Sequence, residues 1–243
     1  MEVIRFLISG QTAHFKKPDV NSYCYYTYNH LPKPQLLGIL GAVLGLGGYT
    51  QQGESQYPEF YEKLQFLKVA VLPIGNKRGL FSKKVQTFNN SVGYASGETG
   101  NNLIVREQWL EDVKWEILID FTSLEDKDLQ GHLKNILLNG EAVYMPYLGK
   151  NDHMADITEP FLVEIHEVDG AETLESLFKV DDFIFEDDFD DEDEPPFMFK
   201  DYMPVGFTPE NMYEFKKIGF TNRRISTSNA KVYAYNQQNI VFI

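Results

Sequence analysis

The sequence predicts an α+β fold, in which strands and helices alternate over residues 1–168 and a smaller part, residues 169–243, follows. Three observations support this. Hydrophobic residues make up 43% of the 243 residues, which is enough to bury a full core. Strand-like segments alternate with segments of helical spacing in the first part. The second part begins with an acidic insert and ends in a small β-rich extension.

The first predicted strand is Val3–Ser9, a β-rich run bounded by Gly10. An irregular segment, Gln11–His30, follows and carries Lys16, Lys17 and four tyrosines. Lysines beside exposed aromatic rings suit a single-stranded nucleic acid, because cations contact phosphates and rings stack on bases. The alternative is a partly buried edge strand whose tyrosines pack on the core.

A helix is predicted from Pro34 to about Leu46, since proline suits the first turn, where its missing N–H loses nothing. Gly38, Gly41 and Gly45 lie within about 60° of arc on one side, away from the leucines. Each interior glycine costs about 1 kcal/mol relative to alanine, so this face implies close approach to the backbone. Two interpretations stand: tight packing against a sheet, and approach of a phosphate chain near the helix start.

A basic hairpin is predicted within Gly75–Asn102 and the residues after it. Lys83–Phe88 can pair with Leu103–Gln108 across a glycine-rich tip, Gly93–Gly100. Residues 75–106 carry five basic side chains and one acidic side chain. Such a hairpin is hard to explain as core, although a solvated loop is the alternative.

The remaining elements follow from the same patterns of spacing and turn residues. They are the helix Tyr57–Leu67, the strands Lys68–Ile74 and Val113–Phe121, the helix Leu124–Asn139 with Gly140 as its stop, a strand leading into a turn over Ala142–Ile157, the strand Pro160–Val168, and a closing hairpin of Val232–Tyr235 and Ile240–Ile243 around Asn236–Asn239. The order strand, helix, strand, hairpin insertion, strand, helix, strand is that of a ferredoxin-like split unit, the layout of RNA-recognition domains.

The net charge of −14 argues against a nucleic-acid ligand at first sight. However, Asp181–Glu194 holds ten acidic residues and no basic residue, which leaves −4 for the rest, and residues 1–118 carry +2. This run suits a solvated linker or a partner-docking segment, with Phe183, Phe185 and Phe189 as anchors. A calcium loop is less well supported, because the glycine-punctuated ligand spacing is missing.

Cys24 is the only cysteine, so we expect no internal disulfide and no cysteine-based zinc site. It suits a buried small hydrophobic residue better than a nucleophile. The uncharged run Leu36–Gly48 has 13 residues, too few to cross a bilayer, and residues 1–5 run directly into a strand-like pattern. We therefore expect a cytoplasmic protein without membrane contact, metal or cofactor.

Three separated motifs carry a resemblance to a known family. They are the opening segment Arg5–Tyr49, REQWL at Arg106–Leu110, and PYLGKNDHMADI at Pro146–Ile157. Over residues 3–165 the chain resembles the CRISPR-associated family-five proteins of the RAMP superfamily, and most of all their subtype I-B branch. The resemblance implies an RNA-recognition-like palm over residues 1–168 with a thumb hairpin inserted at about 77–108.

The resemblance also implies a function. Such a protein is a subunit of the prokaryotic Cascade surveillance complex in antiviral defence and caps the 5′ handle of the CRISPR RNA. Its implied partners are that handle, the backbone subunit beside the thumb, the large subunit, and target DNA indirectly. The residues that we assign to RNA contact are His14, Lys16, Lys17, Tyr23, Tyr26, Tyr28, Lys33, Gln35, Gly38, Lys77, Arg78, Lys83, Lys84, Arg106, Tyr147 and Lys150.

Two other functions remain as alternatives. One branch of the family cuts repeat RNA without metal, using Tyr, Lys and His, since cleavage needs a base for the 2′-OH and a cation for the phosphorane. Its adjacent Lys-His pair has no counterpart here, although Tyr49 and His153 remain candidates. The other alternative is an acidic protein-interaction adaptor, which would leave the basic hairpin unexplained. We therefore expect a non-catalytic RNA-binding subunit.

Overall fold

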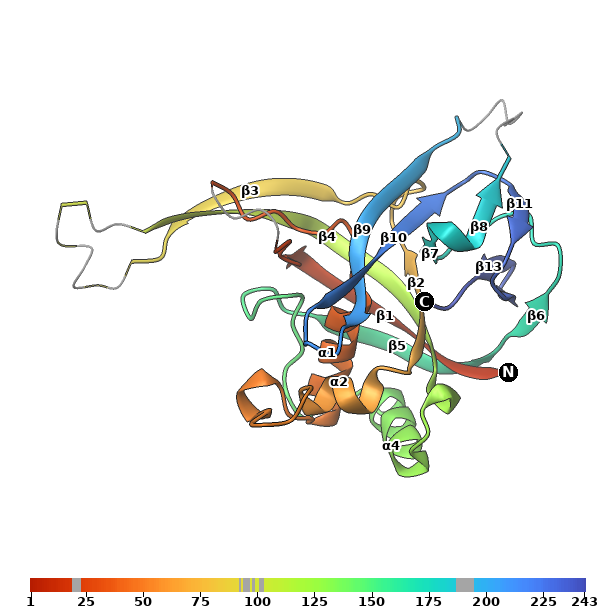
Figure 1. The fold of residues 1–243 in the computed structure, drawn as a ribbon, viewed down its shortest axis with the longest axis horizontal. Coiled ribbons are helices and arrows are strands. Elements are labelled where there is room, and N and C mark those ends of the chain that lie inside the picture. The colour runs from red at the N-terminus through yellow and green to blue at the C-terminus, as the bar shows by residue number, and fades with distance from the viewer. Residues whose placement is uncertain (19–22, 92, 94–96, 98, 101–102, 187–194) are drawn as a thin grey trace.

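The computed structural model describes residues 1–18, 23–91, 93, 97, 99–100, 103–186 and 195–243, and it has the α+β composition expected from the sequence (Figure 1). Its largest sheet has the order β2-β4-β1-β5, and β3 also pairs with β4; all these pairs are antiparallel. The strands are β1 (Glu2–Ala13), β2 (Lys68–Pro73), β3 (Ser82–Asn89), β4 (Ile104–Asp120) and β5 (Asp156–Glu164).

Two strands are longer than their predicted ranges. β1 continues past Gly10 to Ala13, because β4 keeps pairing with it as far as Ala13↔Leu110. β4 joins the two strands predicted at Leu103–Gln108 and Val113–Phe121. Asp112 between them has a positive φ of 48°, and the strand continues through it with its register to β1 unchanged. As a result the β3–β4 hairpin is a direct extension of the sheet, and Figure 1 shows it projecting from the body of the protein.

The predicted hairpin is confirmed for the described residues, but Lys83–Phe88 pairs with Val105–Leu110 instead of Leu103–Gln108, with Lys83 opposite Leu110 and Phe88 opposite Val105. Most of the predicted tip, Gly93–Gly100, lies outside the described residues.

The helices α1 (Lys33–Leu44), α2 (Glu59–Leu64) and α4 (Lys127–Leu138) lie on one side of this sheet (Figure 1). Short 3₁₀ turns occur at Tyr49–Gln51, Phe121–Ser123 and Val180–Asp182. α1 ends two residues earlier than predicted, because Gly45 adopts a left-handed conformation with φ 74° and closes the helix. α2 is shorter than predicted, since Pro58 is its N-cap.

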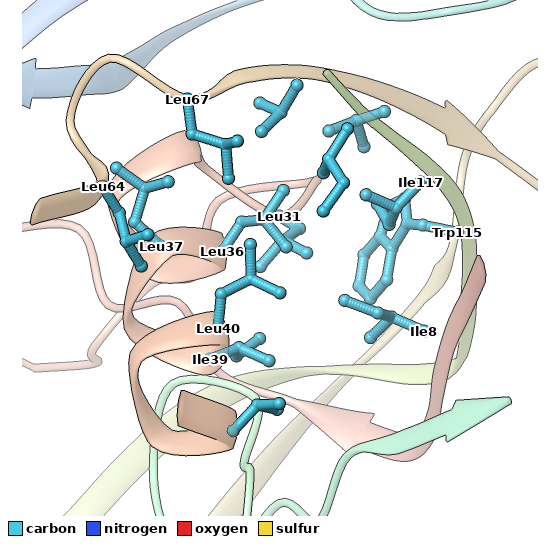
Figure 2. Packing of buried hydrophobic residues seen from close by; sticks show 14 of the residues in the cluster. Ile8, Leu31, Leu36, Leu37, Ile39, Leu40, Leu64, Leu67, Trp115 and Ile117 are labelled. Atoms are coloured by element: carbon cyan, nitrogen blue, oxygen red, sulfur yellow. The ribbon is translucent and has the colours of Figure 1, made fainter. Parts of the chain in front are cut away.

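Leucine side chains of α1 fill the space between the helices and the sheet. Figure 2 shows Leu36 and Leu40 directed toward the strand residues Ile8, Trp115 and Ile117. All five are fully buried. This position explains why α1 carries no charged residue after Lys33, because a charged side chain here would be desolvated.

α4 follows its prediction closely. The Asp126 carboxylate caps the helix by accepting hydrogen bonds from the backbone N–H groups of Asp128 and Leu129, at 2.9 and 3.1 Å. The expected apolar face is buried, and Gly140 follows the end of the helix with φ 67°. The residues of that face are Leu129, Leu133, Ile136 and Leu137.

The strand predicted at the start of Ala142–Ile157 is wrong. The backbone N–H groups of Val143 and Tyr144 donate to the carbonyls of Val43 and Ala42, each at 3.0 Å. These carbonyls belong to the last turn of α1, where i+4 partners run out, and the Ala42 carbonyl also accepts from the N–H of Gly45 at 3.2 Å. This segment therefore caps a helix, and the strand that follows it, β5, begins only at Asp156.

The chain leaves the large sheet after Glu164, so the strand predicted at Pro160–Val168 is divided between two sheets. The second part forms smaller sheets of order β7-β10-β9, β11-β8 and β13-β12-β6. Their strands are β6 (His166–Val168), β7 (Phe178–Lys179), β8 (Phe183–Phe185), β9 (Met198–Phe207), β10 (Tyr213–Thr221), β11 (Ile225–Ser228), β12 (Val232–Tyr235) and β13 (Gln238–Ile240).

The closing hairpin has its predicted first strand, but its second strand begins at Gln238 instead of Ile240. Asn236 and Gln237 both have positive φ, 46° and 65°, so the connection is a tight two-residue turn. Tyr235 and Ile240 of this hairpin pack against Leu118 on the face of the large sheet opposite the helices. Protein therefore covers parts of both faces of that sheet.

The start of the acidic run forms β8, where Phe183 and Phe185 pack on Phe178 with ring centroids 5.5 and 5.0 Å away. These two phenylalanines, two residues apart on one strand, anchor the start of the run on this protein. Phe189 and the rest of residues 187–194 lie outside the described residues.

Candidate nucleic-acid interface

A cleft of about 520 Å³ lies beside α1. α1 contributes Gln35 and Gly38 to its wall, and the segment after α4 contributes Tyr147. These three are predicted RNA-contacting residues, and the fold brings them together from positions more than a hundred residues apart. Further aromatic rings lining the cleft are Tyr49, Phe60, Tyr144, Phe207 and Tyr213.

The glycine face of α1 is divided between packing and the cleft. A Cβ atom placed on Gly41 would lie 2.5 Å from the Cβ of Phe60, and one on Gly45 would lie 2.8 Å from Val143. These two glycines therefore admit close packing, although the neighbours are α2 and the segment after α4 and not a sheet. Gly38, one turn nearer the helix start, has only the ring edge of Phe60 at 3.9 Å and lines the cleft.

The phenols of Tyr49 and Tyr213 in the cleft are protonated at neutral pH. Burial raises the pKa of Tyr49 to about 12 and also raises the pKa of Tyr213. The Tyr213 hydroxyl accepts a hydrogen bond of 3.4 Å from the side-chain amide of Gln35. The cleft thus presents neutral aromatic surfaces and hydrogen-bonding groups, a combination suited to flat heterocycles.

A second group of predicted residues lies along the β3–β4 hairpin. Lys83 and Lys84 of β3 and Arg106 of β4 are exposed. Tyr25 donates its N–H to the carbonyl of Arg106 and accepts from the N–H of Gln108, both at 2.9 Å, so the segment before α1 lies along β4.

From that segment Lys16 is exposed, with its ammonium 3.9 Å from the centroid of the Tyr25 ring. The hairpin root therefore combines cations with aromatic rings.

Three predicted cations are held within the protein. The Lys17 ammonium binds the Asp201 carboxylate at 2.8 Å, and Lys150 binds Glu107 at 2.9 Å. The ammonium of Lys33 donates to the backbone oxygen of Ile243 at 3.0 Å, and burial lowers its pKa to about 8. Their charges are directed at protein groups, so they contribute less to the solvent-facing surface than Lys16, Lys83 and Lys84.

The predicted aromatic residues divide by exposure. Tyr23 and Tyr26 are exposed, by 86% and 42%, whereas Tyr28 is 2% exposed and belongs to the core. His14 is also buried, and its Nδ1 lies 2.9 Å from the carbonyl oxygen of Gln108. The nucleic-acid interpretation of the segment thus suits Tyr23 and Tyr26, and the core-packing interpretation holds for Tyr28.

Lys77 and Arg78 are exposed in the connection between β2 and β3. Cys24 is a free thiol, half-buried instead of buried as expected. Within the described part of the chain, no group of three or more potential ligands could hold a metal ion, and no helix is long and apolar enough to span a membrane.

Sequence reasoning did not assign Tyr144 and Tyr213 to a binding surface. Tyr144 lies two residues before the motif Pro146–Ile157, and this position could have indicated that Tyr144 belongs to the binding surface. No sequence signal marks Tyr213, because only the path of β10 in the folded protein brings this residue to the cleft.

Comparisons with known proteins find similar solved structures. No family model and no curated protein match the sequence. A CRISPR protein from Archaeoglobus fulgidus has a similar structure, with a TM-score of 0.51, 9% identity, and coverage of 99% of this chain and 98% of that chain. A CRISPR RNA-guided surveillance complex chain (TM-score 0.49, 12% identity, coverage 92% and 90%) is also similar. So is a Cas protein (TM-score 0.46, 12% identity, coverage 94% and 96%). The chain therefore has the fold of the Archaeoglobus CRISPR protein.

Proposed function

We propose that this chain is a non-catalytic RNA-binding subunit of a type I CRISPR Cascade complex, similar to those of subtype I-B, and caps the 5′ handle of the CRISPR RNA. Residues 1–168 would be the ferredoxin-like palm, and the β3–β4 hairpin the thumb. The antiparallel order β2-β4-β1-β5, with helices on one side, supports this assignment.

The observation that carries the proposal is the aromatic cleft beside α1. Nucleobases stack on aromatic rings such as Tyr49 and Tyr147, and the absence of a side chain at Gly38 leaves room for a sugar-phosphate chain. Gln35 adds an amide that can donate to or accept from a base edge. A single-stranded RNA end needs these three kinds of contact.

The basic hairpin supports the same function. Lys83, Lys84 and Arg106 offer charges to phosphates outside the cleft, where the RNA would continue toward the backbone subunit. The large subunit would bind another surface and read target DNA, so this chain would contact DNA only indirectly. The complex would act in the prokaryotic cytoplasm.

The environment of the candidate catalytic groups favours a non-catalytic role. A general base works best with a pKa near the operating pH, whereas burial raises the pKa of Tyr49 to about 12. His153 is 1% exposed, and its Nδ1 lies 2.6 Å from the hydroxyl of Thr12. Neither residue is placed to take a proton from a 2′-OH at neutral pH.

Incubation of the purified protein with end-labelled CRISPR repeat RNA in EDTA tests the proposal. We expect a stable complex and intact RNA. Tyr147→Ala should weaken this complex by about tenfold, since one stacked base contributes about 1 to 3 kcal/mol. A Phe66→Ala variant, which removes an exposed ring outside the cleft, should bind as the wild type does. Cleaved RNA would establish the endoribonuclease alternative, and the absence of binding would favour the adaptor.

A further inference from the structure

One face of the β9–β10 ribbon carries a row of aromatic and cationic side chains. Tyr213 lines the cleft, and the ring of Phe215 lies 6.0 Å from it, centroid to centroid. Lys217 pairs across the strands with Tyr202, and its ammonium lies 5.7 Å from that ring. Residues two apart on a strand share a face, so Lys200 joins this set. We call these five residues the ribbon row.

The rings of the ribbon row become more exposed with distance from the cleft, whereas Lys217 is half-buried. Tyr213 is half-buried, Phe215 is 41% exposed and Tyr202 is 63% exposed. On the opposite face of the ribbon, Met203 and Ile218 are buried in the main core. Core packing thus explains the opposite face, and it does not explain large rings on the solvent side.

The charges of the ribbon row are positive. Among the described residues of the two strands, the nearby carboxylates are engaged elsewhere: Asp201 binds Lys17 at 2.8 Å, and Glu214 binds Lys216 at 3.1 Å. Lys200 and Lys217 therefore act on solvent beside exposed rings. Alternating cations and rings match a polyanion whose flat groups can stack, which is a single-stranded nucleic acid.

We propose that the ribbon row is a second nucleic-acid contact, which receives the strand leaving the cleft and guides it along β9 and β10. This inference rests on the proposed RNA-binding function of the cleft. The proposed path of the strand runs from Tyr213 outward over Phe215 to Tyr202, along the second part of the chain.

Binding of two fluorescent oligouridylates to the full-length chain tests the path. One of about 6 nucleotides would occupy the cleft alone, and one of about 16 would extend beyond it. For the double variant Tyr202→Ala with Phe215→Ala, we expect about tenfold weaker binding of the long RNA and a change below about twofold for the short RNA. Lys217→Ala should lower the salt slope of the long RNA by about 0.7.

The ribbon offers matched controls. Lys216→Ala removes the same charge from the adjacent position, whose side chain points to the other face and binds Glu214. Phe66→Ala removes an exposed ring from the connection between α2 and β2. Both controls should bind the long RNA as the wild type does. Variants of the exposed residues Tyr202, Phe215, Lys216 and Phe66 should keep the wild-type unfolding temperature. Lys217 is half-buried, so the unfolding temperature of Lys217→Ala is measured beside its RNA binding.

Two results would overturn the inference while leaving the proposed function intact. One is unchanged long-RNA affinity in the double variant, including the case in which the variant instead weakens assembly with other Cascade subunits, which would make the ribbon row a protein surface. The other is an equal loss for short and long RNA. Failure of the wild type to bind either RNA would instead overturn the proposed function itself. Ultraviolet crosslinking of a 4-thiouridine-substituted long RNA should label the peptide containing Tyr202 and give an independent readout.

Discussion

The cleft beside α1 and the β3–β4 hairpin, the two surfaces that we propose bind RNA, differ in how the fold supports them. In the cleft, the rings and Gly38 are held by packed helices, and the helix itself is almost wholly buried on its sheet side. In the hairpin, Lys83 and Lys84 stand on an exposed two-stranded extension. Substitutions in the cleft should therefore alter both folding and binding, whereas charge changes in the hairpin should alter binding alone.

The largest expected effect at neutral pH is that of Gly41→Leu. The new side chain would start 2.5 Å from the Cβ of Phe60, and overpacking typically costs about 1 to 3 kcal/mol. Urea unfolding should show this loss. The matched change Gly38→Ala has its nearest neighbour at 3.9 Å, so it should retain or raise stability by about 1 kcal/mol. Wild-type stability in Gly41→Leu would mean that this face is open to solvent and would strengthen its assignment as an RNA surface.

The second effect concerns His30, which lies between the start of α1 and the start of β3. Its ring contacts Phe81, just before β3, and Phe199 of β9, with ring centroids 5.9 and 5.0 Å away. Full burial lowers the pKa of His30 from 6.5 to about 3. Between these values the unfolded chain binds the proton and the folded chain does not. Folding stability should thus fall as the pH drops through this window, by about 1.4 kcal/mol per pH unit.

His30→Phe should remove this component and flatten the dependence of unfolding free energy on pH between about 3 and 6.5. His132→Gln, at an exposed position on α4, is the control and should leave the dependence unchanged. An equally steep profile in His30→Phe would show that other groups account for the acid sensitivity.

The third effect is confined to the hairpin. Lys83→Glu combined with Lys84→Glu should flatten the salt dependence of repeat-RNA binding, because each phosphate contact adds roughly −0.7 to the slope. Stability should stay within about 0.5 kcal/mol of the wild type. The same double reversal at Lys127 and Lys231, exposed positions on α4 and just before β12, controls for net charge. A slope that is unchanged in the hairpin variant would place the RNA elsewhere.

The smallest effect should come from the acidic run. Replacing residues 187–194 with a glycine-serine linker of equal length removes seven carboxylates and leaves β8 and its Phe183 and Phe185 in place. Random RNA should then bind a few-fold more tightly, since long-range repulsion is reduced, while repeat RNA should change less. Loss of repeat-RNA binding would instead make the run part of the RNA site.

Local sequence patterns predicted the elements with strong periodicity or clear end signals. The apolar face of α4, its end before Gly140, and the core of α1 follow from spacing alone. The hairpin also follows, because two β-rich runs flank a glycine-rich tip. These features depend on contacts between residues close in sequence.

The errors occurred where distant segments compete for backbone hydrogen bonds. Val143 and Tyr144 resemble a strand, but they cap the end of α1. The sequence of β4 predicts two strands, but pairing with β1 across the predicted break makes it one continuous strand.

The candidate site shows the same division. The sequence by itself determined the residue types: lysines, arginine and tyrosines in the first part, and glycines on one helix face. Only the tertiary structure decided which are accessible, because burial of Tyr28 and the ion pair of Lys17 with Asp201 depend on segments far away in the chain. It also placed Tyr213 in the cleft. Side-chain chemistry is local, whereas exposure, charge neutralisation and proximity arise from packing.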